Sequence, residues 1–459
     1  MRGAQKRGTA REVTMNRIGR RRFIRTSAGA AVASAATLTG CATTATAPQP
    51  QPSRVVGANE RLRVAVVGFR GQGSSHINQL LGLQQNLNVE IAGLCDVDER
   101  VLMAKVKEIG EKTGKAPIAE TDVRRLLDND SIDAITTATP DHWHALVTIW
   151  ACQAGKDVYV EKPVSHNVSE GRKMIEASRK YNRIVQTGTQ NRSNGGVRKA
   201  MELLHQGAIG EVYMARALCY KQRDSIGFKP DAETPPYVHY DLWLGAAPKR
   251  PFNENRFHYN WHWFWDYGTT DMGNQGIHQM DIARWGLNKG LPIKVNGVGG
   301  RFGYKDQGET PNTQVTTFEY DDGVQLVFEV RGRWTNDESG VRVGNLFYGS
   351  DGYMVIDGSS YRIFRGDKKE PEPSQGALEG DVHIANFLKA VRSRKREDLT
   401  ADVFEGHLSS ALCHMGNVSY RLGRKLIFDP KTERFVNDDE ANTYLTRVYR
   451  EPFVVPETV

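Results

Sequence analysis

Residues 63–73 read RVAVVGFRGQG, in which the apolar run VAVV passes directly into a glycine-rich turn. The next residues, SSHINQLLGL (74–83), have the pattern of a helix. A buried strand, a glycine turn and a helix in this order form the context of a phosphate-binding turn. About twenty residues later a second apolar strand, VEIAGLCD, ends in Asp96, where an acid holds ribose hydroxyls and repels a 2′-phosphate. The stretch therefore predicts a dinucleotide-binding domain that takes NAD rather than NADP.

The glycine turn departs from the strict pattern at one position. Glycines stand at 68, 71 and 73, but the second glycine position holds Arg70. The middle glycine ordinarily lets a pyrophosphate approach backbone N–H groups at the helix start. Arg70 therefore either points away or replaces that contact with its guanidinium, and a domain that has lost its ligand is the alternative.

The chain beyond this stretch continues to alternate strands and helices, which predicts a doubly wound parallel sheet in an α/β fold. The expected strands are 133–140, 156–163 and 183–188, and the expected helices are 99–113, 122–129, 144–154 and 169–181. After Gly188 come strand-like runs separated by glycine turns, at 211–220, 294–303, 313–322, 324–334 and 353–359. These runs predict a second α/β domain with a largely antiparallel open sheet.

Composition and charge exclude several classes of protein. The 459 residues are 39% hydrophobic and 25% charged, as in globular proteins, and the net charge is +7. Residues 1–40 hold nine basic side chains and one acid, so the rest of the chain carries about −1. The body therefore has no electrostatic basis for binding nucleic acid.

The N-terminal residues predict export. RRRFIR at 20–25 precedes a small-residue apolar run at 26–39, which is similar to a twin-arginine signal and too short to span a bilayer. Leu38 to Cys41 resembles a lipoprotein box, so we expect 1–41 to be a signal with a lipid-anchored Cys41; the alternative is cleavage nearby with Cys41 an ordinary cysteine. Met15 is an alternative start. Residues 42–60 predict a linker, and the expected location is the periplasm or cell envelope.

The other four cysteines, Cys95, Cys152, Cys219 and Cys413, show no metal or redox spacing. They are interpreted as buried small hydrophobic residues.

Several motifs together resemble one family. ATPDHWH at 138–144, EKP at 161–163 and GNQGIHQMD at 273–281, after the glycine turn, are similar to the glucose-fructose oxidoreductase, inositol dehydrogenase and MocA (Gfo/Idh/MocA) family. The resemblance implies an NAD(P)-binding Rossmann domain at 61–188, a substrate and oligomerisation domain at 189–428 and an extension at 429–459. It also implies a homo-oligomer, and helices at 381–393 and 404–423 are expected to cover the second sheet.

The resemblance also implies the site residues. Lys162 and His278 are the expected catalytic pair, one contacting the reacting hydroxyl and one moving protons near neutral pH. Substrate contacts are expected from Arg192, Trp263, His278 and Asn274. Cofactor contacts are expected from Gly68, Phe69, Arg70, Gly71, Gly73, Asp96, Thr139, Pro140, His144, Glu161 and Lys162.

Position 274 departs from the family, which usually carries an aspartate four residues before the histidine. Asn274 can hydrogen-bond a sugar hydroxyl but cannot act as a base. Asp271 or Asp281 is a candidate substitute.

Two further clusters have open interpretations. His142 and His144, with His258, His262 and His278, fit no compact metal motif, so no metal site is predicted, and the pair at 142 and 144 is expected in a loop beneath the nicotinamide. The run YNWHWFWDYG at 259–268 is either a carbohydrate-stacking wall or a hydrophobic cover.

Three functions follow as hypotheses. The first is an exported NAD-dependent oxidoreductase for a sugar, polyol or glycoside, which must carry its cofactor and regenerate it on the protein. The second is an NAD-dependent glycosidase or lyase that works through a transient keto-sugar. The third is a sugar-binding lipoprotein on a former dehydrogenase fold.

Overall fold

The computed structural model describes residues 60–368, 370–372, 380 and 382–459. The predicted signal, its Cys41 and the linker up to residue 59 lie outside the described residues. Within these ranges, no helix has the length and apolar character needed to cross a bilayer.

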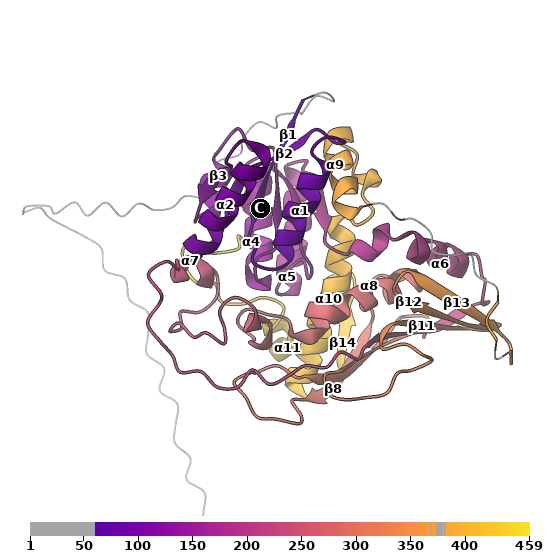
Figure 1. The fold of residues 1–459 in the computed structure, drawn as a ribbon. Coiled ribbons are helices and arrows are strands. Elements are labelled where there is room, and N and C mark those ends of the chain that lie inside the picture. The colour runs from indigo at the N-terminus through magenta and orange to yellow at the C-terminus, as the bar shows by residue number, and fades with distance from the viewer. Residues whose placement is uncertain (1–59, 369, 373–379, 381) are drawn as a thin grey trace, which may run out of the picture. The chain divides into compact units, whose positions relative to one another are not determined.

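The first sheet has six parallel strands in the order β3-β2-β1-β4-β5-β6, which is the doubly wound arrangement that the alternating pattern predicts (Figure 1). Its nearly continuous apolar strands are buried on both faces, as parallel sheets require. The strands are β1 (Leu62–Val67), β2 (Val89–Cys95), β3 (Ile118–Glu120), β4 (Ala134–Thr137), β5 (Asp157–Val160) and β6 (Val185–Thr187).

Five helices connect these strands, and side-chain caps fix where three of them begin. Asp98, Asp122 and Asn167 each accept a backbone N–H from the first turn of the helix that follows. The helices are α1 (Gln72–Leu83), α2 (Glu99–Thr113), α3 (Val123–Leu127), α4 (Asp141–Gln153) and α5 (Val168–Lys180).

Both faces of the first sheet are completed by late segments of the chain. On one face, Phe387 and Leu388 of α9 (His383–Ser393) pack in the same core as Leu62 and Tyr159. The expectation that this helix covers the second sheet is therefore wrong, because its apolar side faces the first. On the other face, Phe453 contacts Trp143 edge to face, at 5.4 Å between ring centroids.

The second sheet has nine strands in the order β13-β12-β11-β7-β10-β9-β8-β14-β15. Every neighbouring pair is antiparallel except β7 and β10, which confirms the predicted fold class. The strands are β7 (Val212–Cys219), β8 (Lys294–Gly300), β9 (Thr313–Glu319), β10 (Gln325–Arg331), β11 (Val343–Gly349), β12 (Gly352–Asp357), β13 (Ser360–Arg365), β14 (Leu426–Asp429) and β15 (Arg434–Phe435).

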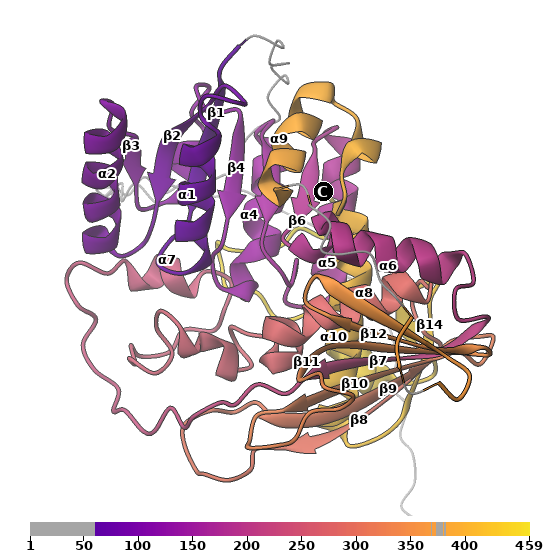
Figure 2. The same cartoon turned by 45° about the vertical axis from the view of Figure 1, so that its right-hand side comes forward.

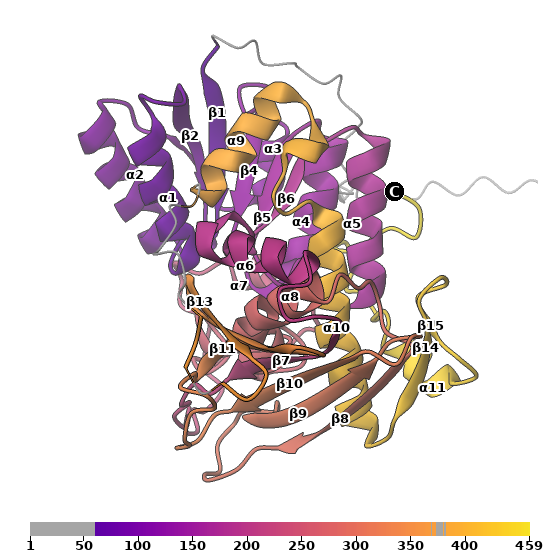
Figure 3. The same ribbon diagram turned by 90° about the vertical axis from the view of Figure 1, so that its right-hand side faces the viewer.

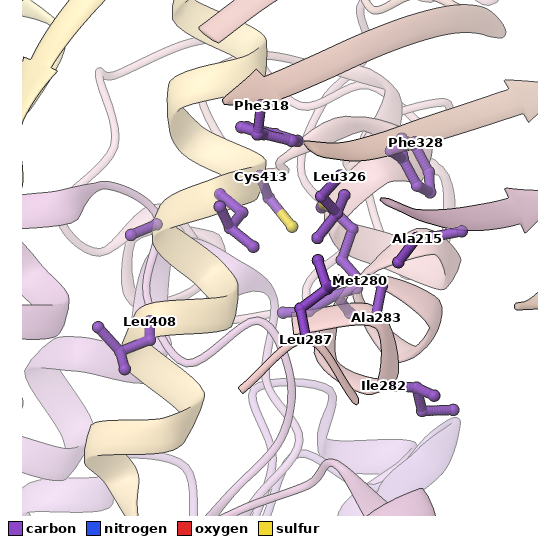
Figure 4. Close-up of a cluster of buried hydrophobic side chains, with 14 of the residues drawn as sticks. Ala215, Met280, Ile282, Ala283, Leu287, Phe318, Leu326, Phe328, Leu408 and Cys413 are labelled. Carbon is purple, nitrogen blue, oxygen red and sulfur yellow. The ribbon is translucent and has the colours of Figure 1, made fainter. Parts of the chain in front are cut away.

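Helices lie between the two sheets, and Figure 3 shows α10 running from one sheet to the other. Leu408 and Leu412 of α10 (Val403–Leu422), Met280 of α8 (Ile277–Gly286), and Phe318 and Phe328 of the second sheet belong to one buried core, part of which is drawn in Figure 4. The remaining elements are α6 (Gly195–His205), α7 (Tyr240–Leu244), α8 (Ile277–Gly286), α10 (Val403–Leu422), α11 (Asp439–Thr443), and the short turns η1 (Gln190–Ser193), η2 (Asn260–Trp263), η3 (Met272–Gly276) and η4 (Arg396–Asp398).

The four described cysteines are buried and unpaired, as predicted.

Candidate active site

The turn between β1 and α1 requires glycine at two of its positions. Gly68 has φ +70°, and a Cβ there would lie 3.1 Å from the backbone nitrogen of Thr139. A Cβ on Gly73 would lie 2.0 Å from the carbonyl oxygen of Gly68, so this glycine allows the helix to pack closely on the strand. Gly71 faces open space. The turn therefore has the shape of a nucleotide-binding turn, with room for a ligand above Gly71.

The start of α1 suits an anion. Its first turn holds no acidic side chain, and its first backbone N–H groups have no partner within the helix. Arg70 is exposed beside it and lines the adjoining cavity. Its guanidinium therefore adds positive charge at the position where the strict pattern has glycine.

Asp96 stands at the end of β2 and holds the glycine turn in place. Its Oδ2 accepts the backbone N–H of Phe69 at 3.2 Å, and its Oδ1 accepts that of Asp98 at 3.0 Å. Burial raises the pKa of this carboxyl above its ordinary value, against these two hydrogen bonds. A carboxylate oxygen has more than one acceptor position, so Asp96 can still accept ribose hydroxyls.

A covering segment, residues 226–267, lies over the β2–α2 loop. The backbone N–H of Glu99 donates to the carbonyl of Tyr237, and that of His239 donates to Val97, both at 2.9 Å. The guanidinium of Arg100 stacks on the ring of Tyr237, 3.4 Å from its centroid. Figure 2 shows α7 of this segment below the ends of α1 and α2. The segment also has its own aromatic core, which includes Tyr240, Trp243, Phe252, Phe257, Phe264 and Tyr267.

The covering segment also brings a histidine against a carboxylate next to the expected ribose position. His258, at φ +68°, places Nε2 3.2 Å from Oδ2 of Asp98, and burial lowers the pKa of this histidine to about 4. The second domain therefore closes over the end of β2, where a dinucleotide would place its adenosine.

A cavity of about 460 Å³ extends from the glycine turn to the second domain. Its wall contains all but one of the expected cofactor residues, namely Gly68, Phe69, Arg70, Gly71, Asp96, Thr139, Pro140, His144, Glu161 and Lys162. The exception is Gly73, which packs against the turn instead. These residues fit a nicotinamide dinucleotide by the shape of the turn, the helix start and the acid at the end of β2.

Glu161 is a buried anion that organises the floor of this cavity. Its Oε1 lies 3.0 Å from Nε2 of His76 and accepts the amide of Gln190 at 3.1 Å, while Oε2 accepts the backbone N–H of Lys162. Burial would raise the pKa of Glu161, but the hydrogen bond with His76 and the charge of Lys162 are among the interactions that bring it to about 2. A fixed negative charge therefore lies next to Lys162 and His278.

Lys162 and His278 come together at the inner wall of the cavity, as the resemblance implies. Nζ of Lys162 donates a hydrogen bond to the backbone carbonyl of Asn274. Burial and the charge of Lys162 lower the pKa of His278 to about 4, so its ring is neutral at pH 7. Its Nδ1 is buried and has no hydrogen-bond partner among the described residues.

Asp141 is a site residue that the sequence did not indicate. It begins α4, lines the cavity, and accepts a 2.6 Å hydrogen bond from the hydroxyl of Thr269. Burial raises its pKa to about 7, although the bond from Thr269 and the charge of Lys162 act in the opposite direction. The only available signal was its place beside the histidine segment, since Thr269 lies 128 residues away.

His142 and His144 lie in the first turn of α4, so the expectation of a loop was wrong. The helix begins at Asp141, so both histidines lie inside it. Nδ1 of His144 lies 2.6 Å from the carbonyl of Pro163 and Nε2 lies 2.9 Å from that of Thr139, so the ring braces the two backbone segments beside Lys162. Across the described ranges, no three metal-ligating side chains gather.

Two expected substrate residues are placed elsewhere. Arg192 is buried in a two-point ion pair with Asp281, at 2.8 and 2.9 Å, and also contacts Glu405. It braces η1 against α8 and α10 and does not line the cavity. Trp263 is buried with guanidinium groups of Arg223 and Arg301 on its ring, 5.9 and 5.1 Å from its centroid. Both expectations are therefore corrected.

Asn274 lines the cavity as expected, and neither nearby aspartate substitutes for an acid there. Asp271 is completely buried in an ion pair with Arg223, and Asp281 is held by Arg192 and Ser409. Both carboxylates are neutralised in place and neither lines the cavity.

The aromatic run at 259–268 is divided between the cavity wall and the core of the covering segment, and its carbohydrate-stacking role stays a prediction. Tyr259 and Trp261 line the cavity, whereas Trp263, Phe264 and Tyr267 belong to the core of the covering segment. Within η2, Trp261 lines the cavity and Trp263 packs in the core. No periodicity in the sequence indicated this division.

Comparison with known proteins shows which family the chain matches. A model of the oxidoreductase family's NAD-binding Rossmann fold matches residues 62–189, and a model of its C-terminal alpha/beta domain matches 228–455. An "Uncharacterized oxidoreductase" of Streptococcus pneumoniae serotype 4 is 31% identical over 150 residues, 32% of this chain and 39% of that protein. A "Glycosyl hydrolase family 109 protein 1" of Shewanella sp. strain ANA-3 is 26% identical over 216 residues, 44% of this chain and 46% of that protein.

A solved structure shares the fold over most of the described residues. The WlbA dehydrogenase of Bordetella pertussis, in complex with NADH and UDP-GlcNAcA, has a TM-score of 0.62 and 20% identity, covering 81% of this chain and 99% of that one. The matched segments span less than half of the two curated relatives. With both domains matched and the Rossmann cavity formed, the chain belongs to the Gfo/Idh/MocA family of NAD-dependent oxidoreductases.

Proposed function

We propose that the protein oxidises a hydroxyl of a sugar, polyol or glycoside with a tightly held NAD. The observation that supports this most directly is that Lys162 and His278 share one wall of a cavity whose other end is the glycine turn and Asp96. One continuous cavity thus has features for a dinucleotide at one end and proton-handling side chains at the other.

The bound cofactor would supply a hydride acceptor for the carbinol carbon. The ammonium of Lys162 binds the substrate hydroxyl and stabilises negative charge as it develops on that oxygen. His278, neutral at pH 7 because of burial and Lys162, accepts the hydroxyl proton on the imidazole nitrogen that faces the cavity. The fixed charge of Glu161 then stabilises the protonated ring.

Tight retention of the cofactor follows from the covering segment. Its contacts with the β2–α2 loop would have to break before an adenosine could leave. We further propose that the chain is exported by the twin-arginine route as an envelope lipoprotein anchored at Cys41. In that setting the cofactor is reoxidised on the protein, so turnover is redox-paired or redox-neutral.

Mass spectrometry of small molecules released by denaturing purified residues 42–459 tests the cofactor. Stoichiometric NAD(H) is expected, and neither recovery nor binding of NAD would contradict the proposal. Lys162→Met should retain the cofactor and lose at least about a thousandfold in keto-sugar formation. Envelope fractionation of the full chain, with Cys41→Ser as the matched control, tests the anchor.

A second candidate is NAD-dependent glycoside cleavage. It is favoured by the curated relatives described as glycosyl hydrolase family 109 proteins. In that reaction a transient keto group permits elimination of the glycosidic substituent, and water addition and re-reduction complete a redox-neutral cycle. Release of free reducing sugar from an aryl glycoside supports this candidate, whereas keto-sugar without cleavage supports the first.

A further inference from the structure

A second cavity of about 340 Å³ adjoins the first. It lies between η1, the start of α8 and strands β11 and β12. Gln190, Gln275 and His278 line both cavities, so His278 stands where the two meet. A molecule that reacts at His278 lies in the first cavity, beside the expected cofactor site. It can therefore extend from His278 into the second cavity.

Among the residues that the structure describes, the lining of the second cavity is rich in amides and has no cation. Five of its twelve lining residues are carboxamides, Asp357 is the one carboxylate, and neither lysine nor arginine contributes. Ile282, Val343 and Ile356 add apolar surface. Amides that donate and accept hydrogen bonds, next to a small apolar patch, suit a neutral ring with many hydroxyls.

Buried acceptors in this wall lack partners. Oδ1 of Asn345 and Oε1 of Gln279 are buried and accept no hydrogen bond from the residues that the structure describes. Nδ2 of Asn345 donates to the backbone carbonyl of Gln279 at 2.7 Å, which fixes the orientation of that amide. A buried acceptor without a donor costs free energy, and a hydroxyl in the cavity would remove that cost.

We propose that the second cavity binds a second sugar ring, so that the substrate is a neutral disaccharide, oligosaccharide or glycoside whose reacting ring lies in the first cavity. This rests on the proposed function for the position of the reacting ring. A nucleotide sugar is a poor fit, because a diphosphate needs cationic partners and none lines the second cavity.

The experiment compares kcat/KM for reduction of bound NAD in the holoenzyme of residues 42–459. The probes are methyl β-glycosides of glucose, galactose and xylose, the disaccharides cellobiose, lactose and xylobiose, and UDP-glucose. At least one disaccharide is expected to exceed its methyl glycoside by about tenfold or more. Val343→Phe, which fills the second cavity, should remove that advantage, whereas Val298→Phe on exposed β8 should keep it.

Gln279→Leu provides a second variant that does not depend on filling the cavity. It removes a buried oxygen without a partner, so the melting temperature should stay the same or rise while KM for the disaccharide increases about tenfold. A preference for UDP-glucose, or a disaccharide advantage that survives Val343→Phe, would overturn the proposal. Oxidation of methyl glycosides with no disaccharide advantage overturns it and leaves the proposed function intact, and reduction by no neutral sugar overturns both.

Discussion

The side chain of Lys162 is held by the backbone of Asn274, through a hydrogen bond from Nζ to the carbonyl oxygen. The lysine follows the fifth strand of the first sheet, and the carbonyl lies in η3 directly before α8. The two domains are thus joined at the reacting position by a contact that does not use the side chain of residue 274.

Asn274→Ala should therefore keep kcat within a fewfold and raise KM about tenfold, because it loses a substrate contact and not the lysine contact. Asn274→Asp adds a negative charge beside His278 and should raise the pKa of that ring from about 4, which moves the acid limb of the rate profile to higher pH. Steady-state kinetics at about pH 7 give kcat and KM, and rate profiles extended down to about pH 4 locate the acid limb. Equal losses of kcat in the two variants would contradict this account.

Asp141→Asn should stabilise the protein at alkaline pH. Burial raises the pKa of Asp141 to about 7, so its stabilising protonated form is fully present below the ordinary pKa near 3.8 and is lost as pH rises through 7. The variant should therefore exceed the wild type in unfolding free energy by on the order of 4 kcal/mol above about pH 8, with little difference below about pH 4. Thermal unfolding at both values checks this, and a difference independent of pH would refute it.

Acid should progressively destabilise the protein as the pH falls below about 6.5. Burial lowers the pKa of several imidazoles to about 3 or 4, while an unfolded chain takes up these protons near pH 6.5. Their contribution to the unfolding free energy is thus complete above about pH 6.5 and is lost as the pH falls toward 4. The expected loss is on the order of several kcal/mol. Calorimetry with proton-uptake measurements tests this. The residues are His142, His262, His278 and His414.

Tyr237→Ala should accelerate loss of NAD from the holoenzyme by about tenfold. The change removes the ring on which Arg100 stacks and loosens the covering segment over the β2–α2 loop. Phe228→Ala is the matched control, because Phe228 lies in the same segment with 69% of its surface exposed. Dilution followed by filtration and nucleotide quantification measures the rates. Equal rates in both variants would show that the segment does not retain the cofactor.

The parts of the site that the sequence predicted correctly are those governed by local spacing. Gly68, Gly73 and Asp96 lie within one strand–helix–strand unit, so their relationship is fixed over a short stretch of chain. Lys162 and His278 followed from the resemblance, and the structure brings them to one cavity.

The errors come from partners distant in the sequence. In the sequence, Arg192 has the features of a substrate-binding cation. In the structure its charge is neutralised by Asp281 and Glu405, which are 89 and 213 residues away. Asp141 is paired across 128 residues, and α9 has an apolar side that fits either sheet in principle. Composition and hydrophobic periodicity predict that the apolar side of a helix is buried. They do not predict which surface of the protein buries it.

The order in which the first domain acquires its core has a consequence for biogenesis. One face of its sheet is closed by α9, at 383–393, and the other by Phe453, Val455 and Val459. In a nascent chain that has emerged only as far as residue 380, part of each face of that sheet would still be uncovered. The first domain, although encoded first, therefore completes its core only after residues 383–459 have been synthesised.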